Sequence, residues 1–213
     1  MAAFLAHHSP ITVVETISGN TDFTGSDNEA ASQTFLAGTP VYLASGNITA
    51  WTGNTTQLIG GISMEDAHNL ASAGLGAPTP FTGVGFPGTG TTFGSVPNET
   101  SAVNIPRGAP FVTGQILYDK SVDDTIFEGQ FDNSTLGTSV GATPTQALVG
   151  TLAGLTADLT APIYWYVDGG KTTPGTGTTN AAVEIVGLSP IDGAIPNGRV
   201  RFRFLKAVSQ FQQ

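Results

Sequence analysis

Cysteine is absent from the 213 residues of the chain, and charged side chains make up only 11% of it. The missing thiols exclude disulfides, thiolate metal ligands and a cysteine nucleophile. Cations are scarce, because seven Lys and Arg stand against sixteen Asp and Glu, which gives a net charge of −9, and the first cation is Arg107. The residues before Arg107 cannot build a surface that neutralises phosphates, so we expect neither nucleic acid nor an anionic membrane as a partner unless the four cations between Arg199 and Lys206 act alone.

Long apolar runs and helical patterns are also scarce. No stretch approaches the roughly 18 uncharged apolar residues of a membrane helix, and the apolar residues Met1 to Leu5 lack the basic flank and the length of a signal peptide. Only residues 63–71 and 144–154 predict a helix, and both stretches are short. At most one or two short helices are therefore expected.

The chain is instead rich in small and β-branched residues, with 28 Gly, 13 Pro and 30 Thr. Runs of Val, Ile, Phe, Tyr and Thr bounded by Gly, Pro, Asn and Asp predict strands. These runs are residues 11–17, 40–43, 57–62, 111–118, 125–131, 163–167, 182–186 and 199–205. The predicted fold class is all-β, a sandwich or barrel of short strands joined by long loops rich in Gly, Pro and Thr.

The spacing of the polar and Gly/Pro-rich stretches predicts how the chain is divided. We expect an extended N-terminal arm over 1–34, a small β lobe over 35–70, a Gly/Pro-rich loop over 71–104 and a larger β lobe over 105–213. A single domain over 35–213 is the alternative. No internal repeat is evident in the sequence.

The motifs that could carry chemistry are weak. Gly83 to Gly88 matches G-x-G-x-x-G, but no strand precedes it and Pro87 opposes a following helix, so a loop is expected. Glu65 and His68 have the spacing of a di-metal helix motif without its second copy. Asp119, Asp123 and Asp124 depart from calcium-loop spacing. The three histidines, His7, His8 and His68, have no informative setting. We therefore expect no catalytic residue, metal or cofactor.

The strongest pattern is in the last predicted strand. Strict alternation places Arg199, Arg201 and Arg203 on one face and Val200, Phe202 and Phe204 on the other. Adjacent like charges repel unless an acidic surface faces them. That surface is either the chain's own Asp and Glu, the interpretation we favour, or an acidic patch on a neighbouring subunit or capsid. The terminal residues Phe4 and Phe211 are further candidates for a subunit or capsid interface.

Several of these segments resemble small structural proteins carried by tailed bacteriophages. The resemblance covers about 35–70 and 115–206, and its motifs are Phe35 to Val41, Trp51 to Gly53, Ile59 to Asn69, Asp124 to Gly129, Trp165 to Asp168 and Arg199 to Phe202. It implies a virion protein of the head decoration, or cement, kind. Proteins of that kind are β-rich, often trimeric, and sit on the outer capsid surface, and they supply no catalytic residues.

The resemblance implies the major capsid protein as partner and a homotrimer as the oligomeric state. We expect the N-terminal arm and one edge of the sheet to contact the shell. The alternative is a receptor- or glycan-binding β module of a virion or cell surface, in which Trp51, Trp165, Tyr164 and Tyr166 act as stacking platforms.

Overall fold

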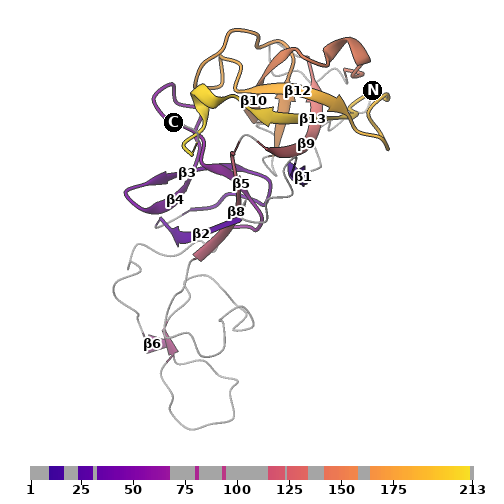
Figure 1. Ribbon diagram of the computed structural model, residues 1–213. Helices are drawn as coiled ribbons and strands as arrows, with labels where there is room; N and C mark the ends of the chain where they lie inside the picture. The colour runs from indigo at the N-terminus through magenta and orange to yellow at the C-terminus, as the bar shows by residue number, and fades with distance from the viewer. Residues whose placement is uncertain are drawn as a thin grey trace, which may run out of the picture.

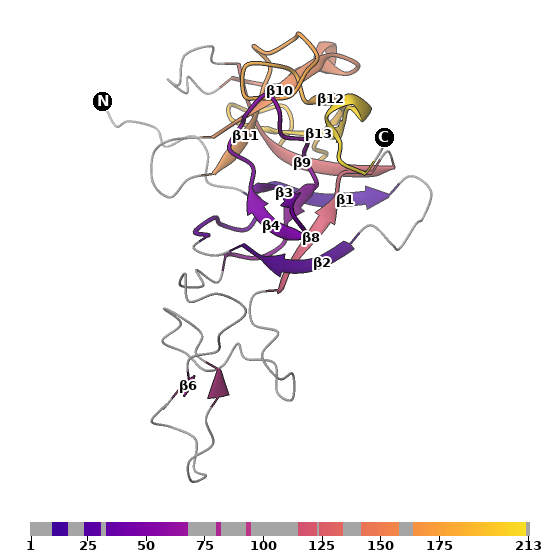
Figure 2. The ribbon, with the colours of Figure 1, turned by 90° about the vertical axis from the view of Figure 1, so that its left-hand side faces the viewer.

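The computed structural model shows two packed β units, one above the other in Figures 1 and 2. It describes residues 10–16, 24–30, 33–67, 80–81, 93–94, 115–122, 124–133, 142–157 and 164–211. The helical elements among these residues are two three-residue 3-10 turns, η2 (Gln146–Leu148) and η3 (Lys206–Val208). The predicted all-β fold class is confirmed.

The first unit, directly below the second unit in Figure 1, is a closed barrel with the strand order β2-β4-β3-β5-β8. Its strands are β2 (Thr24–Glu29), β3 (Pro40–Ala44), β4 (Asn47–Ala50), β5 (Gly61–Ser63) and β8 (Gln115–Lys120). Ser45 and Gly46 join β3 to β4 with φ of 52° and 79°, the left-handed conformation that a two-residue hairpin favours. A separate pair, β6 (Pro80–Phe81) and β7 (Phe93–Gly94), lies between β5 and β8 in the chain.

The second unit is a sheet with the order β1-β9-β11-β10-β12-β13, in which β13 also pairs with β9. That pairing closes five of its strands into a ring and leaves β1 attached at the side of β9. The strands are β1 (Thr12–Thr16), β9 (Thr125–Asp132), β10 (Leu152–Ala157), β11 (Trp165–Asp168), β12 (Val183–Leu188) and β13 (Arg199–Phe204).

The two units have the same topology. With β1 set aside, each unit has five strands, and the first of them in the chain pairs in parallel with the third. All other pairings among the five are antiparallel, and the spatial order is first, third, second, fourth, fifth. The register agrees as well, because aligning Val41 with Ala153 brings all five pairings into correspondence. The matched pairs are Val41–Gly61 with Ala153–Val183, Leu43–Ile48 with Leu155–Val167, Gly61–Lys120 with Val183–Phe204, Gly25–Tyr118 with Phe127–Phe202, and Glu29–Ile48 with Phe131–Val167.

The turns before the second strand of each unit also correspond. Gly38 and Gly150 both have positive φ, 83° and 84°. The Gly38 N–H donates to the Ser63 carbonyl, and the Gly150 N–H donates to the Ile185 carbonyl, each at 2.8 Å. The chain therefore contains a structural repeat of one five-stranded unit, which the sequence pattern did not indicate.

The buried apolar residues form two clusters, and the larger one takes in residues of both units. The interior of the first barrel holds Phe35, Val41, Ile48, Ile116 and Tyr118. The larger cluster fills the second unit and also takes in residues of the first unit, among them Trp51, Ile59 and Ile62. The rings of Trp51 and Trp165 lie 5.2 Å apart between centroids, one from each unit. Burial of this shared apolar surface stabilises the two units against each other.

Several predicted elements differ from the structure. The stretch 63–71 was expected to be helical, but Ser63 ends β5 and no helix follows in the described residues up to Ala67. The stretch 144–154 contains only η2 before β10 begins at Leu152. β2 lies within the range 1–34, which was expected to be an extended arm. The strand pairs with β8, in which Tyr118 stands opposite Gly25. A Cβ at position 25 would lie 2.4 Å from Cζ of the Tyr118 ring, so the ring fits there because residue 25 is a glycine.

The structure also divides the chain differently from the expected ranges. The first barrel takes β2 from the range 1–34 and β8 from the range 105–213, and combines them with strands from 35–70. The second unit adds β1, again from the range 1–34, to strands between Thr125 and Phe204. Most of the expected loop 71–104 lies outside the described residues.

Candidate interaction surfaces

The arginine row lies on β13, between β12 and β9. Alternation along the strand is as predicted, because Val200, Phe202 and Phe204 are buried and the three arginine side chains are partly exposed. The buried rings hold the strand in place, since Phe127 stacks on Phe202 and meets Phe204 edge to face at centroid distances of 5.8 and 5.1 Å.

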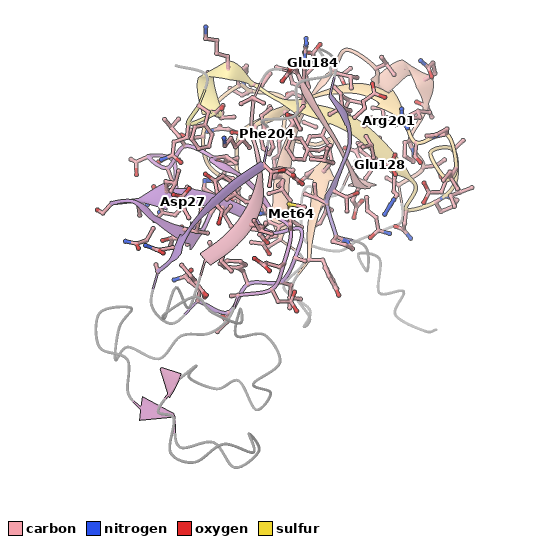
Figure 3. The ribbon with its side chains drawn as sticks, turned by 60° about the horizontal axis from the view of Figure 1, so that its bottom comes forward. Asp27, Met64, Glu128, Glu184, Arg201 and Phe204 are labelled. Carbon is pink, nitrogen blue, oxygen red and sulfur yellow. The ribbon has the colours of Figure 1, made fainter. Side chains whose placement is uncertain are left out.

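Two carboxylates of the same chain lie closest to this row. Arg199 and Arg201 donate to the two oxygens of Glu128 at 2.8 and 3.4 Å, and Arg203 donates to Glu184 at 2.8 Å. The register explains the pairs, because Glu128 stands opposite Arg201 and Glu184 opposite Arg203. Figure 3 shows Arg201 and Glu128 side by side. The favoured interpretation, that the chain's own acids face the arginines, is confirmed; a contact of the row with a subunit or capsid stays a prediction.

The other two candidate interface residues lie at the chain ends. Phe4 is outside the described residues. Phe211 is partly exposed and stacks on Tyr118 of the first barrel at a centroid distance of 6.3 Å. The segment before it is tied to the same barrel, because the Gln210 side chain accepts from the Leu43 N–H and donates to the Leu43 carbonyl, both at 2.9 Å.

The structural repeat explains why the C-terminal segment lies there. Ile59 forms a parallel bridge with Ser209, and the corresponding residue of the second unit, Ala181, forms one with Pro174. The hydrogen bonds match: Val208 accepts from the Ile59 N–H, as Thr173 accepts from the Ala181 N–H, each at 2.7 Å. The first barrel is thus completed by the chain's C-terminal segment at the position where the second unit uses its own loop.

Buried polar side chains line part of the first barrel. The Tyr118 hydroxyl donates to Asp27 at 2.8 Å, and burial together with this carboxylate raises the pKa of the tyrosine. Burial also raises the pKa of Asp119 from 3.8 to about 6, partly opposed by a hydrogen bond from Thr24. These groups lie on neighbouring strands without forming a set of nucleophile, base and orienting group.

The aromatic platforms expected of a glycan-binding module are mostly inside the protein. Trp51, Trp165 and Tyr166 are 1%, 7% and 3% exposed, and Tyr164 is partly buried. The Trp51 indole N–H donates to the Gln57 carbonyl at 3.2 Å. Three of the four rings therefore contribute to the core in this structure and offer no open face for a sugar.

The weak chemical motifs gain little support. The stretch Gly83 to Gly88, the three histidines and Asp123 lie outside the described residues. Glu65 accepts a hydrogen bond from the Leu117 N–H at 2.8 Å, which is a structural role. Within the described part of the chain, no group of three or more His, Asp or Glu side chains could hold a metal ion. No helix there is long and apolar enough to cross a membrane.

One surface was missed by the sequence analysis. The β12–β13 loop, residues 189–198, exposes a set of apolar side chains, and Ile191 is 92% and Ile195 53% exposed. Figure 1 shows this loop projecting from the ends of β12 and β13. The signal in the sequence is a run of Pro, Ile and Ala without the alternation of a strand or the period of a helix, bounded by turn residues.

No protein-family model, curated protein or solved structure matches this chain. The fold and its surfaces define an all-β protein of two repeated units with an ion-paired arginine row, an edge strand and an exposed apolar loop.

Proposed function

We propose that the chain is a non-enzymatic virion structural protein, a decoration or cement protein that binds the major capsid protein on the outer surface of a phage head. It acts as a homotrimer and stabilises contacts between capsomers. Its resemblance to small phage structural proteins supports this function, as does an acidic surface poor in lysine, which suits the outside of a shell that encloses DNA.

The observation that carries the proposal is the edge strand β1. It pairs with β9 along one side, and among the described residues no strand pairs with its other side. Thr12, Val14 and Glu15 of this strand are exposed. An unpaired strand edge is a template for a strand of another protein. The edge therefore offers the shell a main-chain contact that continues from the N-terminal residues.

The mechanism needs binding energy alone. A protein that binds the assembled shell and not separated capsomers lowers the free energy of the assembly. Three linked copies make the attachment multivalent, so that modest individual contacts hold through their effective concentration. The shared core between the two units keeps the contact surfaces in a fixed relation during binding.

The test is rebinding to undecorated heads, assembled from the major capsid protein encoded with this chain and measured by co-sedimentation. Removal of residues 1–9 and the substitution Val14→Glu should each lower occupancy at least tenfold with unchanged melting temperature. The deletion stops at residue 9 because the buried Ile11 and β1 follow directly. Gln146→Glu, at an exposed residue of η2 outside β1 and the arginine row, is the control and should leave occupancy unchanged. Failure of the unmodified protein to sediment with heads would overturn the proposal.

A further inference from the structure

The β12–β13 loop holds two side-chain oxygens that are buried without a hydrogen-bond partner. They are Oδ1 of Asp192 and Oδ1 of Asn197. Carboxylate and amide oxygens accept hydrogen bonds and cannot donate them. A buried acceptor without a partner costs free energy, so in a folded protein it indicates a bound water or ion that supplies the missing contact.

Main-chain oxygens of the same loop gather beside Gly198. A Cβ at position 198 would lie within 3.0 Å of three carbonyl oxygens, those of Asp192, Gly193 and Ile195. A glycine is therefore needed at this position, and the room that a side chain would fill stays next to the oxygens. The Ile195 carbonyl accepts from the Gly198 N–H at 2.8 Å and keeps a second lone pair for another contact. With the two side-chain oxygens, the loop presents five oxygens from residues 192–198.

The backbone holds these oxygens in place. Asn197 has a positive φ of 57°, and its N–H donates to the Ala142 carbonyl at 3.0 Å. The Gly193 N–H donates to the Ser189 carbonyl at 3.1 Å. A loop fixed in this way loses little conformational entropy when a ligand binds.

The charges around Asp192 favour a cation as the ligand. The three carboxylates of Glu15, Glu128 and Asp192 contact only two arginines, Arg199 and Arg201, so this group of side chains carries one net negative charge. Glu128 takes the 2.8 Å bond of Arg199, whereas the contact of Arg199 with Asp192 is 3.9 Å long and involves Oδ2. The other oxygen of Asp192, Oδ1, is therefore left for a ligand.

We infer that the β12–β13 loop binds a calcium ion through Oδ1 of Asp192, Oδ1 of Asn197 and the carbonyl oxygens beside Gly198. Calcium takes about six to eight oxygen ligands, which include Asp carboxylates, Asn side chains, main-chain carbonyls and waters, in a flexible geometry. Waters complete the shell, because the Asp192 side chain is 35% exposed. Magnesium needs a nearly ideal octahedron and gives up its waters reluctantly, so it fits a loop of carbonyl oxygens less well.

The site differs from the groups of three or more acidic or histidine side chains that are absent among the described residues. It has a single carboxylate and its other ligands are uncharged, so the dissociation constant should be about 10⁻⁴ to 10⁻³ M. A bound ion stabilises the folded chain by mass action and links Asp192 to Asn197 across the loop. Calcium binding goes beyond the proposed function and does not depend on it.

Isothermal titration calorimetry on the full chain, first freed of metal with EDTA, tests the site. CaCl₂ should bind with a dissociation constant in this range, and about 10 mM CaCl₂ should raise the melting temperature by about 3 °C. MgCl₂ at the same concentration should raise it by less than about 1 °C. No response to CaCl₂ would mean that the buried oxygens meet water alone, and equal shifts with the two salts would mean that ions only screen the net charge of −9. Either result would overturn the inference.

Asn197→Gly removes one ligand and keeps the backbone. Glycine adopts a φ of 57° without strain, so in EDTA the variant should melt within about 2 °C of the unmodified chain. Its calcium dissociation constant should rise about tenfold or more, because the ion loses a side-chain oxygen. If Asn197 served the turn alone, the variant would bind calcium as the unmodified chain does, and the inference would be wrong.

Asp192→Asn and Asp66→Asn form a matched pair, because each removes one negative charge and Asp66 is exposed and lies outside the loop. Asp192→Asn should weaken calcium binding about tenfold or more, whereas Asp66→Asn should leave the dissociation constant within about twofold. Equal losses in the two variants would show that net charge alone attracts calcium.

Amide NMR spectra recorded during the titration locate the ion. The N–H signals of Gly193 and Gly198 lie closest to the inferred ligands and should shift most on addition of CaCl₂. Calcium-dependent shifts that are largest outside residues 189–198 would place the ion elsewhere and overturn the inference.

Discussion

The carboxylate of Glu128 holds two arginines, whereas that of Glu184 holds one. Glu128 is 5% exposed, so its charge depends on Arg199 and Arg201 for compensation. The Glu184–Arg203 pair is more open, with exposed fractions of 29% and 43%. The ion pairs of Glu128 and Glu184 with the arginines of β13 should therefore contribute differently to the free energy of unfolding.

Replacing Glu128 should cost much more stability than replacing Glu184. Glu128→Gln removes the charge from a buried site and leaves two guanidinium groups short of a partner, and we expect a loss of about 2 kcal/mol in the free energy of unfolding. Glu184→Gln disrupts a partly exposed pair and should cost less than about 1 kcal/mol. Urea titration of both variants measures the difference, and equal losses would contradict this account.

Asp119 predicts a dependence of stability on pH. Its pKa is about 6 in the folded chain against an ordinary 3.8, because burial disfavours its charge. Between these values the folded chain keeps a proton that the unfolded chain releases, so this group lowers stability as pH rises from about 4 to about 6.

Asp119→Asn should remove that loss. Relative to the unmodified protein, the variant should gain free energy of unfolding progressively between pH 4 and pH 6 and keep the gain at pH 7. Asp66→Asn, at an exposed carboxylate, is the matched control. A stability difference that does not change with pH would show that Asp119 does not titrate in this window.

At the scale of elements, the corresponding turns at Gly38 and Gly150 offer a matched pair of variants. Both glycines have positive φ, but a Cβ at Gly150 meets no atom within 4 Å, whereas one at Gly38 would lie 2.5 Å from Pro10 Cβ and 2.6 Å from the Ile11 nitrogen. Gly150→Ala should cost about 1 kcal/mol from backbone strain alone.

Gly38→Ala should cost more, because the new methyl group also displaces the chain that leads into β1. Differential scanning calorimetry measures both losses, and hydrogen exchange of the β1 amides shows the displacement. If the two variants lose equal stability, the close approach of Pro10 and Gly38 does not contribute.

Strands could be predicted where polar and apolar residues alternate in the sequence. They were missed where a strand has no apolar residues of its own and forms through pairing with a neighbouring strand. β13 alternates Arg with apolar residues and was predicted almost to its ends. β2, with the sequence TGSDNE, has no apolar side chain and forms because β8 pairs along it and Tyr118 covers Gly25. Residues 152–154 of β10 belong to the stretch 144–154 that was expected to be helical, and the pairing of β10 with β11 and β12 overrode that preference.

At the scale of the whole molecule, the shared core predicts that the two units unfold together. The larger hydrophobic cluster takes residues from both units, and Trp51 and Trp165 meet at their contact. Tryptophan fluorescence reports this contact and far-UV circular dichroism reports the strands. The two signals should give one coincident urea transition. A separate transition seen by only one signal would show that the units unfold independently.

The repeat is visible in three dimensions and hidden in the sequence, because corresponding positions fill the same space in different ways. Phe127 and Phe131 of the second unit correspond to Gly25 and Glu29 of the first. The first barrel compensates with the ring of Tyr118 across Gly25. Backbone pairing is the same in both units, whereas the side chains at corresponding positions differ, so the sequence does not reveal the repeat.

The sequence by itself determined the all-β class, the alternation of β13 and the lack of any disulfide, because these follow from composition and from the period of a single strand. Tertiary structure decided which acids meet the arginines, that β2 and β8 share a barrel, and that the C-terminal segment completes it. It also decided which apolar residues stay exposed, Ile191 above all. These features join residues far apart in the chain, and no local pattern specifies such contacts.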